Sequence, residues 1–307
     1  MFGRLFAESG LSLDRLRALV EVGSAGSIAQ AAAGDPVRQS QYSRQIKELE
    51  DFFQTRLLER QGKGMRFTAS GRELARISRF FLLGLSNFQR GCLAEERTYR
   101  IGGCATFLRA FVLPTLGHGR NLRPGITYTV EALPDETVER RLHDLTLDFG
   151  IVTNPNLSRP LQSKPLGTWH LQLWAPGELE ARAATRLFRE KRLPFVLPAE
   201  TPLPWNSVLA EHKPSLCCDT FLEAHEILIE QSLAVVLPDF LLRREKARRF
   251  VQLPISAADK PSGKGKSSPM FSYRLAWNPR LLRLNPQATH RRDFLVDSLA
   301  KRFGQRG

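Results

Sequence analysis

The sequence predicts an α+β protein of several domains, with a helical N-terminal part and an α/β C-terminal part. At 307 residues the chain is about twice the usual domain size. Apolar residues recur at helical spacing through the first ninety positions. From about residue 97, segments that alternate apolar and polar residues, such as 126–132, come between helical segments, which is typical of βαβ units with a parallel sheet.

The composition is that of an ordinary globular protein, with 42% hydrophobic and 25% charged residues. A net charge of +14 favours a polyanionic partner, either nucleic acid or an anionic membrane surface. No apolar run approaches the roughly 20 residues that span a bilayer, and the first ten residues lack the core of a secretory signal. We therefore expect a cytoplasmic protein without a membrane partner. The four cysteines have no C-x-x-C spacing, so we expect neither zinc nor dithiol chemistry.

The positive charge is unevenly distributed. Residues 1–97 carry 15 Lys+Arg and 11 Asp+Glu, or +4; residues 98–238 carry 14 and 15, or −1; residues 239–307 carry 16 and 5, or +11. Net charge alone would place a nucleic-acid surface around residues 243–249 and 260–266. The motifs described next favour the interpretation that these cations are solvated side chains on a helix end and a loop.

The first seventy residues have the outline of a helix-turn-helix. Amphipathic helices are predicted over 13–22 and 39–53, with a short helix over 28–33 between them. Ser27 is expected to cap the short helix, and Gly34-Asp35-Pro36 to end it, because proline disfavours a helical conformation in its predecessor. The longer helix begins with side chains that can reach base edges and phosphates in a major groove.

A glycine-punctuated basic segment follows at 60–68, and its length and charge suit a hairpin that lies along the phosphate backbone. A helix-turn-helix outline alone is more often plain core packing. The helices and this hairpin in one order over sixty residues are a much stronger signal.

These residues resemble the winged helix-turn-helix of LysR-type transcriptional regulators, from Leu13 to about Gly71. The resemblance rests on Gly26-Ser27-Ile28-Ala29, Ser43-Arg44-Gln45-Ile46, Leu57-Leu58-Glu59-Arg60 and Thr68-Ala69-x-Gly71. Asp35 stands where the family usually has leucine, which implies a different packing of the turn. Arg38 and Ser40 stand where it usually has serine and proline, which implies an altered N-cap and base preference. The resemblance implies a DNA-binding domain over 1–71 that contacts double-stranded promoter DNA. The predicted DNA-binding residues are Ser27, Gln39, Ser40, Gln41, Ser43, Arg44, Lys47, Arg60, Lys63 and Arg66.

Residues 72–96 are predicted to form a linker and dimerisation helix. Leu74, Phe81 and Phe88 fall seven apart, with Ile77 and Leu85 beside them, and this apolar seam needs a covering partner. The resemblance implies a dimer through residues 72–93, and the protein is predicted to be a homodimer or homotetramer. Packing against the chain's own second domain is the alternative.

The remaining residues, 97–307, are predicted to form an effector-binding domain. Strands are expected at 99–102, 126–132, 147–153, 193–197, 215–218, 233–237 and 271–277; helices are expected from Phe107 to Pro114 and over 135–142, 221–231 and 285–303. This order resembles the two-lobed, periplasmic-binding-protein-like domain of the same family. Lobe I is placed at about 97–168 and 269–303, and lobe II at about 169–268.

A small-molecule effector is implied in the cleft between the lobes. In α/β lobes, ligands lie at the carboxyl ends of strands and at helix N-termini. Asp135 is expected to cap its helix; a free carboxylate there would disfavour a carboxylate effector. The predicted effector-binding residues are Cys104, Thr106, Phe107, Asp135, Thr153, Thr201, Trp205 and Thr220. The alternative is that they are turn residues and caps that touch no ligand.

No motif indicates an enzyme, a cofactor or a metal. The sequence has no G-x-G-x-x-G, Walker A or G-x-S-x-G motif, and its six histidines lack metal-ligand spacing. We predict a sequence-specific regulator whose oligomer changes geometry on promoter DNA when an effector binds. The alternatives are a ligand-binding module without DNA activity, a cysteine-based redox-sensing regulator using Cys104 or Cys217 and Cys218, and an architectural DNA-coating protein.

Overall fold

The computed structural model describes residues 10–61, 64–93, 97–118, 124–202, 209, 212–231, 233–242, 250–253 and 270–304. The chain divides into two compact units, Met1–Glu96 with Arg280–Pro286, and Arg97–Pro279 with Gln287–Gly307. The basic stretches at 243–249 and 260–266, which net charge alone singled out, lie outside the described residues. No helix in the described ranges is long and apolar enough to span a bilayer.

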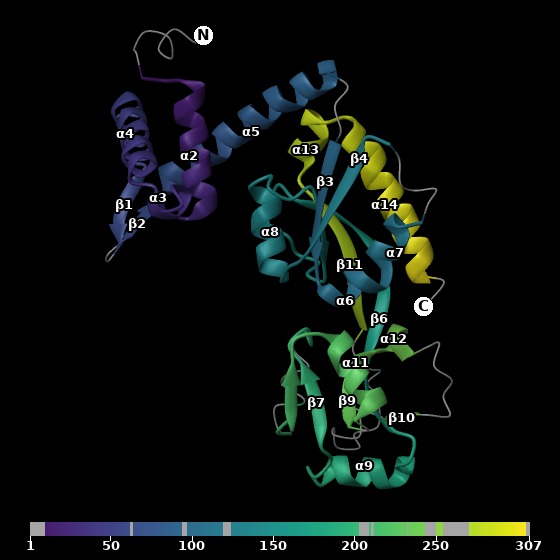
Figure 1. The fold of residues 1–307 in the computed structure, drawn as a ribbon. Coiled ribbons are helices and arrows are strands. Elements are labelled where there is room, and N and C mark those ends of the chain that lie inside the picture. Colours follow the sequence, from purple (N-terminus) through teal and green to yellow (C-terminus); the bar gives the residue numbers. More distant parts are fainter. Residues whose placement is uncertain are drawn as a thin grey trace. The chain divides into compact units, whose positions relative to one another are not determined.

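The N-terminal unit is the predicted winged helix-turn-helix followed by a long helix (Figure 1). Its elements are α2 (Leu13–Ala25), α3 (Ile28–Ala31), α4 (Pro36–Phe53), the hairpin of β1 (Leu58–Gln61) and β2 (Gly64–Phe67), and α5 (Ala69–Leu93). The core packs Leu19 and Val22 of α2 against Ile46 and Leu49 of α4, with Leu57 at the entry to the hairpin. The helices predicted from apolar spacing over 13–22 and 39–53 thus supply most of this core.

The helix starts of this unit agree with the sequence in one place and correct it in another. Ser27 caps α3, accepting a hydrogen bond from the backbone N–H of Gln30 at 3.2 Å, as predicted. Helix α4 begins at Pro36, three residues before the predicted start. Asp35 caps it by accepting from the N–H groups of Val37 and Arg38 at 2.8 and 3.3 Å. The N–H group at the first helical position has no acceptor within the helix, so proline, which lacks an N–H, fits there. The segment that ends the short helix therefore also starts the next one.

The C-terminal unit contains one mixed sheet in two halves joined by the long strand β6 (Gln162–Pro176). The first half consists of β3 (Arg97–Gly103), β4 (Ile126–Ala132), β5 (Phe149–Val152), β11 (Met270–Trp277) and the part of β6 up to His170. Helices α8 (Asp135–His143) and α14 (Gln287–Gly304) lie on opposite sides of this half (Figure 1).

The second half of the sheet takes the rest of β6. It contains β7 (Phe195–Pro198), β8 (Leu216–Cys218), β9 (Ala234–Pro238) and β10 (Phe250–Leu253), and it packs with α9 (Ala181–Arg189), α11 (Phe221–Glu230) and α12 (Asp239–Leu242). Strand β6 pairs with β9 from Leu171 to Trp174. The predicted two-lobed α/β architecture is thus confirmed.

The sheet is only partly parallel, which corrects the prediction. Strand β3 pairs in parallel with β4 and β5, and β7 with β8 and β9, but β6 and β11 run antiparallel to their neighbours. Strand β6 was not predicted because Pro165 and Gly167 interrupt its pattern. The register with β11 shifts at this point, and Gly167 has φ +153°, where an added Cβ would lie 2.3 Å from the Phe303 ring.

The helical segment after β3 also departs from the sequence prediction. It runs from Ala105 to Leu116 as α6 (Ala105–Phe107), a π-helical turn (Leu108–Val112) and α7 (Leu113–Leu116), so Pro114 does not end it. The π-turn widens the backbone, and its closing bond runs from Leu113 N to Leu108 O. Proline is tolerated at the start of the turn that follows. Near the C-terminus, α13 (Pro279–Leu284) precedes α14, and Pro286 lies just outside the final helix.

Candidate functional site

The first half of α4 is an exposed polar surface. Every residue from Pro36 to Gln41 is exposed, as are Ser43, Arg44 and Lys47, and even Val37 leaves 76% of its surface in solvent. Gln39, Ser43 and Lys47 recur at intervals of four and share a face with Ser40 and Arg44, whereas the spacing places Gln41 off that face. The structure therefore brings five of the predicted DNA-binding residues together on one face of a helix.

Arg44 is exposed but already oriented. Its Nε donates to Glu48 Oε1 at 3.1 Å, and Glu48 also forms an ion pair with Arg15 of α2. The hydrogen bond from Arg15, with a smaller contribution from Arg44, holds the pKa of Glu48 below its usual value. Ser27, by contrast, is occupied as the cap of α3 and also donates to Gln30 Oε1 at 3.1 Å.

Glu50, which sequence reasoning missed, connects α4 to the hairpin. Its Oε1 accepts hydrogen bonds from Leu57 N at 2.7 Å and Leu58 N at 3.0 Å. Leu57 comes directly before β1 and Leu58 is its first residue. One carboxylate therefore fixes the hairpin relative to the exposed helix. A charged residue on the inward face of an amphipathic helix was the available signal.

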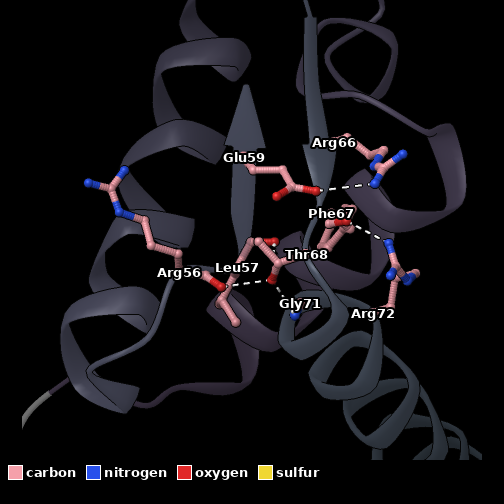
Figure 2. Close-up of polar contacts among 8 residues, drawn as sticks. All are labelled: Arg56, Leu57, Glu59, Arg66, Phe67, Thr68, Gly71 and Arg72. Carbon is pink, nitrogen blue, oxygen red and sulfur yellow. Dashed lines mark hydrogen bonds and ion pairs between the residues drawn. The ribbon is translucent and has the colours of Figure 1, made fainter. Parts of the chain in front are cut away.

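The base of the hairpin is fixed to α5 by Thr68 and Gly71 (Figure 2). Thr68 Oγ1 donates to Arg56 O at 2.7 Å and accepts from Gly71 N at 3.0 Å, while Thr68 N donates to Leu57 O at 3.0 Å. A Cβ on Gly71 would lie 2.1 Å from Leu57 O, so only glycine fits without a backbone shift. The Thr68-Ala69-x-Gly71 motif thus positions the hairpin.

Of the three cations predicted for the hairpin, the structure places one side chain. Arg66 of β2 is exposed and its Nη2 donates to Glu59 Oε1 at 3.3 Å across the hairpin, as Figure 2 shows. The backbone of Arg60 lies in β1, but its side chain is outside the described part of the chain, as is all of Lys63.

Helix α5 carries an exposed apolar seam, which we define as Ile77, Phe81, Leu85 and Phe88. These side chains are 51, 47, 43 and 75% exposed, and their spacing of four, four and three residues puts them on one face. Leu74, predicted to be part of the same seam, instead packs partly buried against the N-terminal core. An exposed row of large apolar side chains is typical of a surface covered by a partner.

A cavity of about 810 Å³ lies between the two halves of the C-terminal sheet. Four predicted effector-binding residues line it: Cys104, Asp135, Thr153 and Thr201. Its other lining residues are Ala105, Ala132, Leu133, Pro134, Glu136, Trp169, Ala199, Glu200, Pro202, Asp219 and Tyr273. Trp205 lies outside the described residues.

Three predicted effector-binding residues do not line this cavity. Thr106 is fully buried, and its hydroxyl donates to Glu200 Oε2. Phe107 is fully buried, with its ring centroid 4.4 Å from that of Tyr273 and 4.8 Å from that of Phe111, so it belongs to the aromatic core. Thr220 caps α11 in a capping box with Glu223 and lies at a separate pocket of about 490 Å³. Thr220 is thus a cap residue, as the alternative interpretation has it, whereas Phe107 is a core residue.

Asp135 lies on the cavity but does not cap α8, which corrects the prediction. Pro134 occupies the N-cap position, and Asp135 is the first helical residue. Its Oδ2 instead accepts from Thr153 Oγ1 at 2.7 Å, Thr153 N at 2.8 Å and Asn154 N at 3.3 Å. These contacts hold the start of α8 to the end of β5.

Glu200, which sequence reasoning passed over, also accepts three hydrogen bonds at the cavity. Its Oε2 accepts from Thr106 Oγ1 at 2.5 Å and from Phe221 N at 3.0 Å, and its Oε1 accepts from Thr106 N at 3.3 Å. One carboxylate thereby bridges two helix N-termini, one from each lobe. Its neighbours Thr201 and Trp205 were predicted to bind the effector, but no local pattern distinguishes Glu200 from them.

The thiols near the cavity are poor nucleophiles. Cys104 Sγ lies 3.4 Å from Tyr273 Oη, and burial, reinforced by Glu200, raises the pKa of Cys104 to about 12. Burial also raises the pKa of Cys218 to about 11. Reactive cysteines need a thiolate, so these environments disfavour a redox-sensing role. Among the described residues, no cluster of three or more His, Cys, Asp or Glu side chains could hold a metal ion.

Two family models cover almost the whole chain. Residues 13–72 match the bacterial regulatory helix-turn-helix protein, lysR family, and residues 94–300 match the LysR substrate binding domain. The chain belongs to the LysR family. This LysR-family protein is a DNA-binding transcriptional regulator with an effector-binding domain, as the sequence predicts, and its family consists of regulators rather than enzymes.

Solved structures of full-length regulators have the same fold. A variant of full-length OxyR from Pseudomonas aeruginosa matches with a TM-score of 0.62 and 18% identity, over 95% of each chain. LysG from Corynebacterium glutamicum, solved with bound effector arginine, matches with a TM-score of 0.62 and 16% identity, over 95% of this chain and 99% of that one. ArgP from Mycobacterium tuberculosis matches at 0.61 and 17%, over 91% and 97%. At these identities the likeness concerns the fold.

Proposed function

We propose that this LysR-type regulator reads promoter DNA in the cytoplasm as a homodimer or homotetramer, and that an effector in the interlobe cavity changes the geometry of the oligomer on DNA. The observation that carries the DNA-reading role is the exposed face of α4 with Gln39, Ser40, Ser43, Arg44 and Lys47. A helix of this width fits a major groove, and these side chain types pair with base edges and phosphates.

Arg44 and Arg66 are assigned different tasks on DNA. Arg44 lies on the helix face and can donate to the acceptors of guanine, while Arg66 lies on the hairpin, where its charge suits the phosphate backbone. On a site selected from a random oligonucleotide pool, Arg44→Ala should cost about 1–3 kcal/mol of binding free energy and little on random DNA. Arg66→Ala should weaken both and lower the salt slope by about one.

Binding isotherms at several salt concentrations test this difference, with Arg189→Ala on the exposed face of α9 as the matched control. If Arg44→Ala loses the same binding free energy on selected and random DNA, Arg44 contacts only phosphates and reads no base. No selected site emerging from the pool would contradict the proposed reading of promoter sequence and favour an architectural DNA-coating protein.

A second copy of the chain is the proposed partner of the apolar seam on α5. A dimer covers four large exposed side chains and presents two α4 helices to two half-sites. Phe88→Glu should therefore shift the protein to smaller species in sedimentation velocity and weaken DNA binding. The side chain is 75% exposed in the single chain, so the substitution should leave the monomer fold intact.

Leu13→Glu, at an exposed apolar residue that opens α2, is the matched control for that experiment. An unchanged sedimentation profile for Phe88→Glu would favour the alternative, in which the seam packs against the chain's own second domain. Effector control of geometry requires that the effector bind two oligomer arrangements with different affinity.

A further inference from the structure

The interlobe cavity contains an anion supplied by the chain itself. The Glu200 carboxylate accepts hydrogen bonds at the start of the continuous helical segment 105–116 and at the start of α11, which has ten residues. Free N–H groups at helix N-termini are favourable positions for negative charge. A carboxylate ligand at this position would have to displace Glu200 from three hydrogen bonds.

The remaining charge on the cavity wall has the same sign. Asp135, Glu136 and Asp219 line the cavity with Glu200, and the described lining residues include no lysine, arginine or histidine. Glu136 and Asp219 are exposed, while Asp135 Oδ2 is engaged by Thr153 and Asn154. A second anion would meet repulsion from these carboxylates, and a cation would meet attraction.

Two residues that line the cavity each carry a buried polar group with no partner among the described residues. The Thr201 hydroxyl belongs to a side chain that is 4% exposed, and the Trp169 indole N–H to one that is 1% exposed. Buried polar groups are nearly always hydrogen-bonded, so both indicate a missing ligand group or water. Trp169 can only donate, whereas Thr201 can donate or accept, so the complementary group is an acceptor. The carboxylates on the wall favour an acceptor without a negative charge.

We infer that the interlobe cavity takes a small organic cation that also carries an uncharged hydrogen-bond acceptor, while Glu200 fills the anion position between the two helices. The cavity volume of about 810 Å³ is within the range of small-molecule sites. Trp169 and Tyr273, whose ring centroids are 5.2 Å apart, provide an apolar wall for the hydrocarbon part of such a molecule. The inference rests on the proposed function because this cation would be the effector.

Ligand class is tested on the full-length protein with a set of small hydroxylated amines, carboxylates and amides matched in size, by ligand-observed NMR. Amines should bind, and carboxylates should not. Replacing the two exposed carboxylates of the cavity together, Glu136→Gln with Asp219→Asn, should lower the affinity for the tightest-binding amine at least tenfold. Glu226→Gln, at the separate pocket, should leave that affinity unchanged. Carboxylates binding more tightly than amines, or no amine binding at all, would overturn the inference.

The role of Glu200 is tested separately by chemical rescue. Glu200→Ala should lower the melting temperature, and acetate should restore part of the loss relative to chloride at equal ionic strength, because acetate can occupy the vacated position. Wild type should show no such acetate effect. If Glu200→Ala does not fold, Thr201→Val provides the second variant: it should reduce amine affinity at least fivefold while leaving all three Glu200 contacts in place.

Equal acetate effects on wild type and Glu200→Ala would contradict the assignment of Glu200 to an anion position. Unchanged amine affinity in Thr201→Val would contradict a contact between the amine and Thr201. Selected-site DNA binding by the same preparations, without ligand, separates this inference from the proposed function. A protein that binds its DNA site but no amine would refute the inference alone. A protein that binds amines but no specific DNA would refute the proposed function alone.

Discussion

Helices α4 and α11 both begin next to a carboxylate that accepts from a backbone N–H group, but the two carboxylates differ in how far along the sequence they lie from the helix. Asp35 caps α4 from the adjacent position, with donors two and three residues along the chain. Glu200 binds Phe221 N from 21 residues away and also Thr106, 94 residues away. The same chemistry is thus local at the start of α4 and long-range at the start of α11, and only the local form has its donors and acceptor within a few residues of sequence.

The two carboxylates also differ in their surroundings, and therefore in what their removal should affect. Asp35 is exposed at the first turn of the proposed DNA-reading helix, so its charge faces any phosphate that approaches this end. Glu200 contacts a fully buried threonine and links two lobes. Removing Asp35 should therefore affect one helix and its DNA contact, whereas removing a Glu200 contact should affect the stability of the whole effector domain.

The largest expected effect follows from Thr106→Val. This substitution keeps the side chain size and the Thr106 N–H but removes the hydroxyl that donates to Glu200 Oε2 at 2.5 Å. Hydrogen bonds to charged groups contribute about 1.5–3 kcal/mol, so unfolding of the effector domain in urea should shift by that amount. Thr185→Val, which removes an exposed hydroxyl bonded to Ala181 O, should change it by about 0.5 kcal/mol or less.

An equal effect of the two threonine substitutions would erase the distinction between a local and a long-range contact. It would mean that the Thr106–Glu200 bond adds no more to stability than a solvent-exposed bond within one helix. The bridge would then be a consequence of lobe closure rather than a contributor to it.

A smaller effect is expected from Asp35. Asp35→Ala should destabilise the N-terminal unit by about 0.5–2 kcal/mol because two N–H groups lose their acceptor. Asp35→Asn should retain the cap and most of that stability, and should strengthen DNA binding by about 1 kcal/mol because a negative charge is removed near the phosphates. Melting curves and DNA isotherms of the two variants separate the cap from the charge. Weaker DNA binding by Asp35→Asn would contradict this assignment.

The sequence predicted most of what depends on neighbouring residues. The Ser27 cap, the hairpin, the amphipathic cores and the overall two-lobed fold could be predicted because their signals lie within a few residues. The start of α4 was misplaced because Pro36 ends one helix and begins the next. Strand β6 was missed because its pairing with β11 overrides the unfavourable Pro165 and Gly167.

The candidate site was less predictable, since its contacts join residues far apart in the chain. Topology placed Cys104, Asp135, Thr153 and Thr201 on the cavity wall, as the ends of strands imply. It could not show that the Phe107 side chain packs in the aromatic core. Nor could it show that the hydroxyl and N–H of Thr106 both donate to the Glu200 carboxylate. The DNA-binding assignments remain predictions that the proposed binding experiments test.

The smallest effect is expected at Cys104, which caps the same helical segment that Glu200 contacts. Its sulfur accepts from Phe107 N at 3.4 Å, and a thiolate would be the better acceptor. Burial and the nearby Glu200 carboxylate nevertheless raise its pKa to about 12, so near pH 7.5 the thiol stays protonated. Because thiolates are the nucleophiles, iodoacetamide and dilute peroxide at this pH should modify the exposed Cys217 while leaving Cys104 intact by mass spectrometry. DNA affinity should be the same before and after treatment, and equal in Cys104→Ser. Rapid oxidation of Cys104 with a change in DNA affinity would restore the redox-sensing alternative, and would show that burial does not protect the thiol at this helix start.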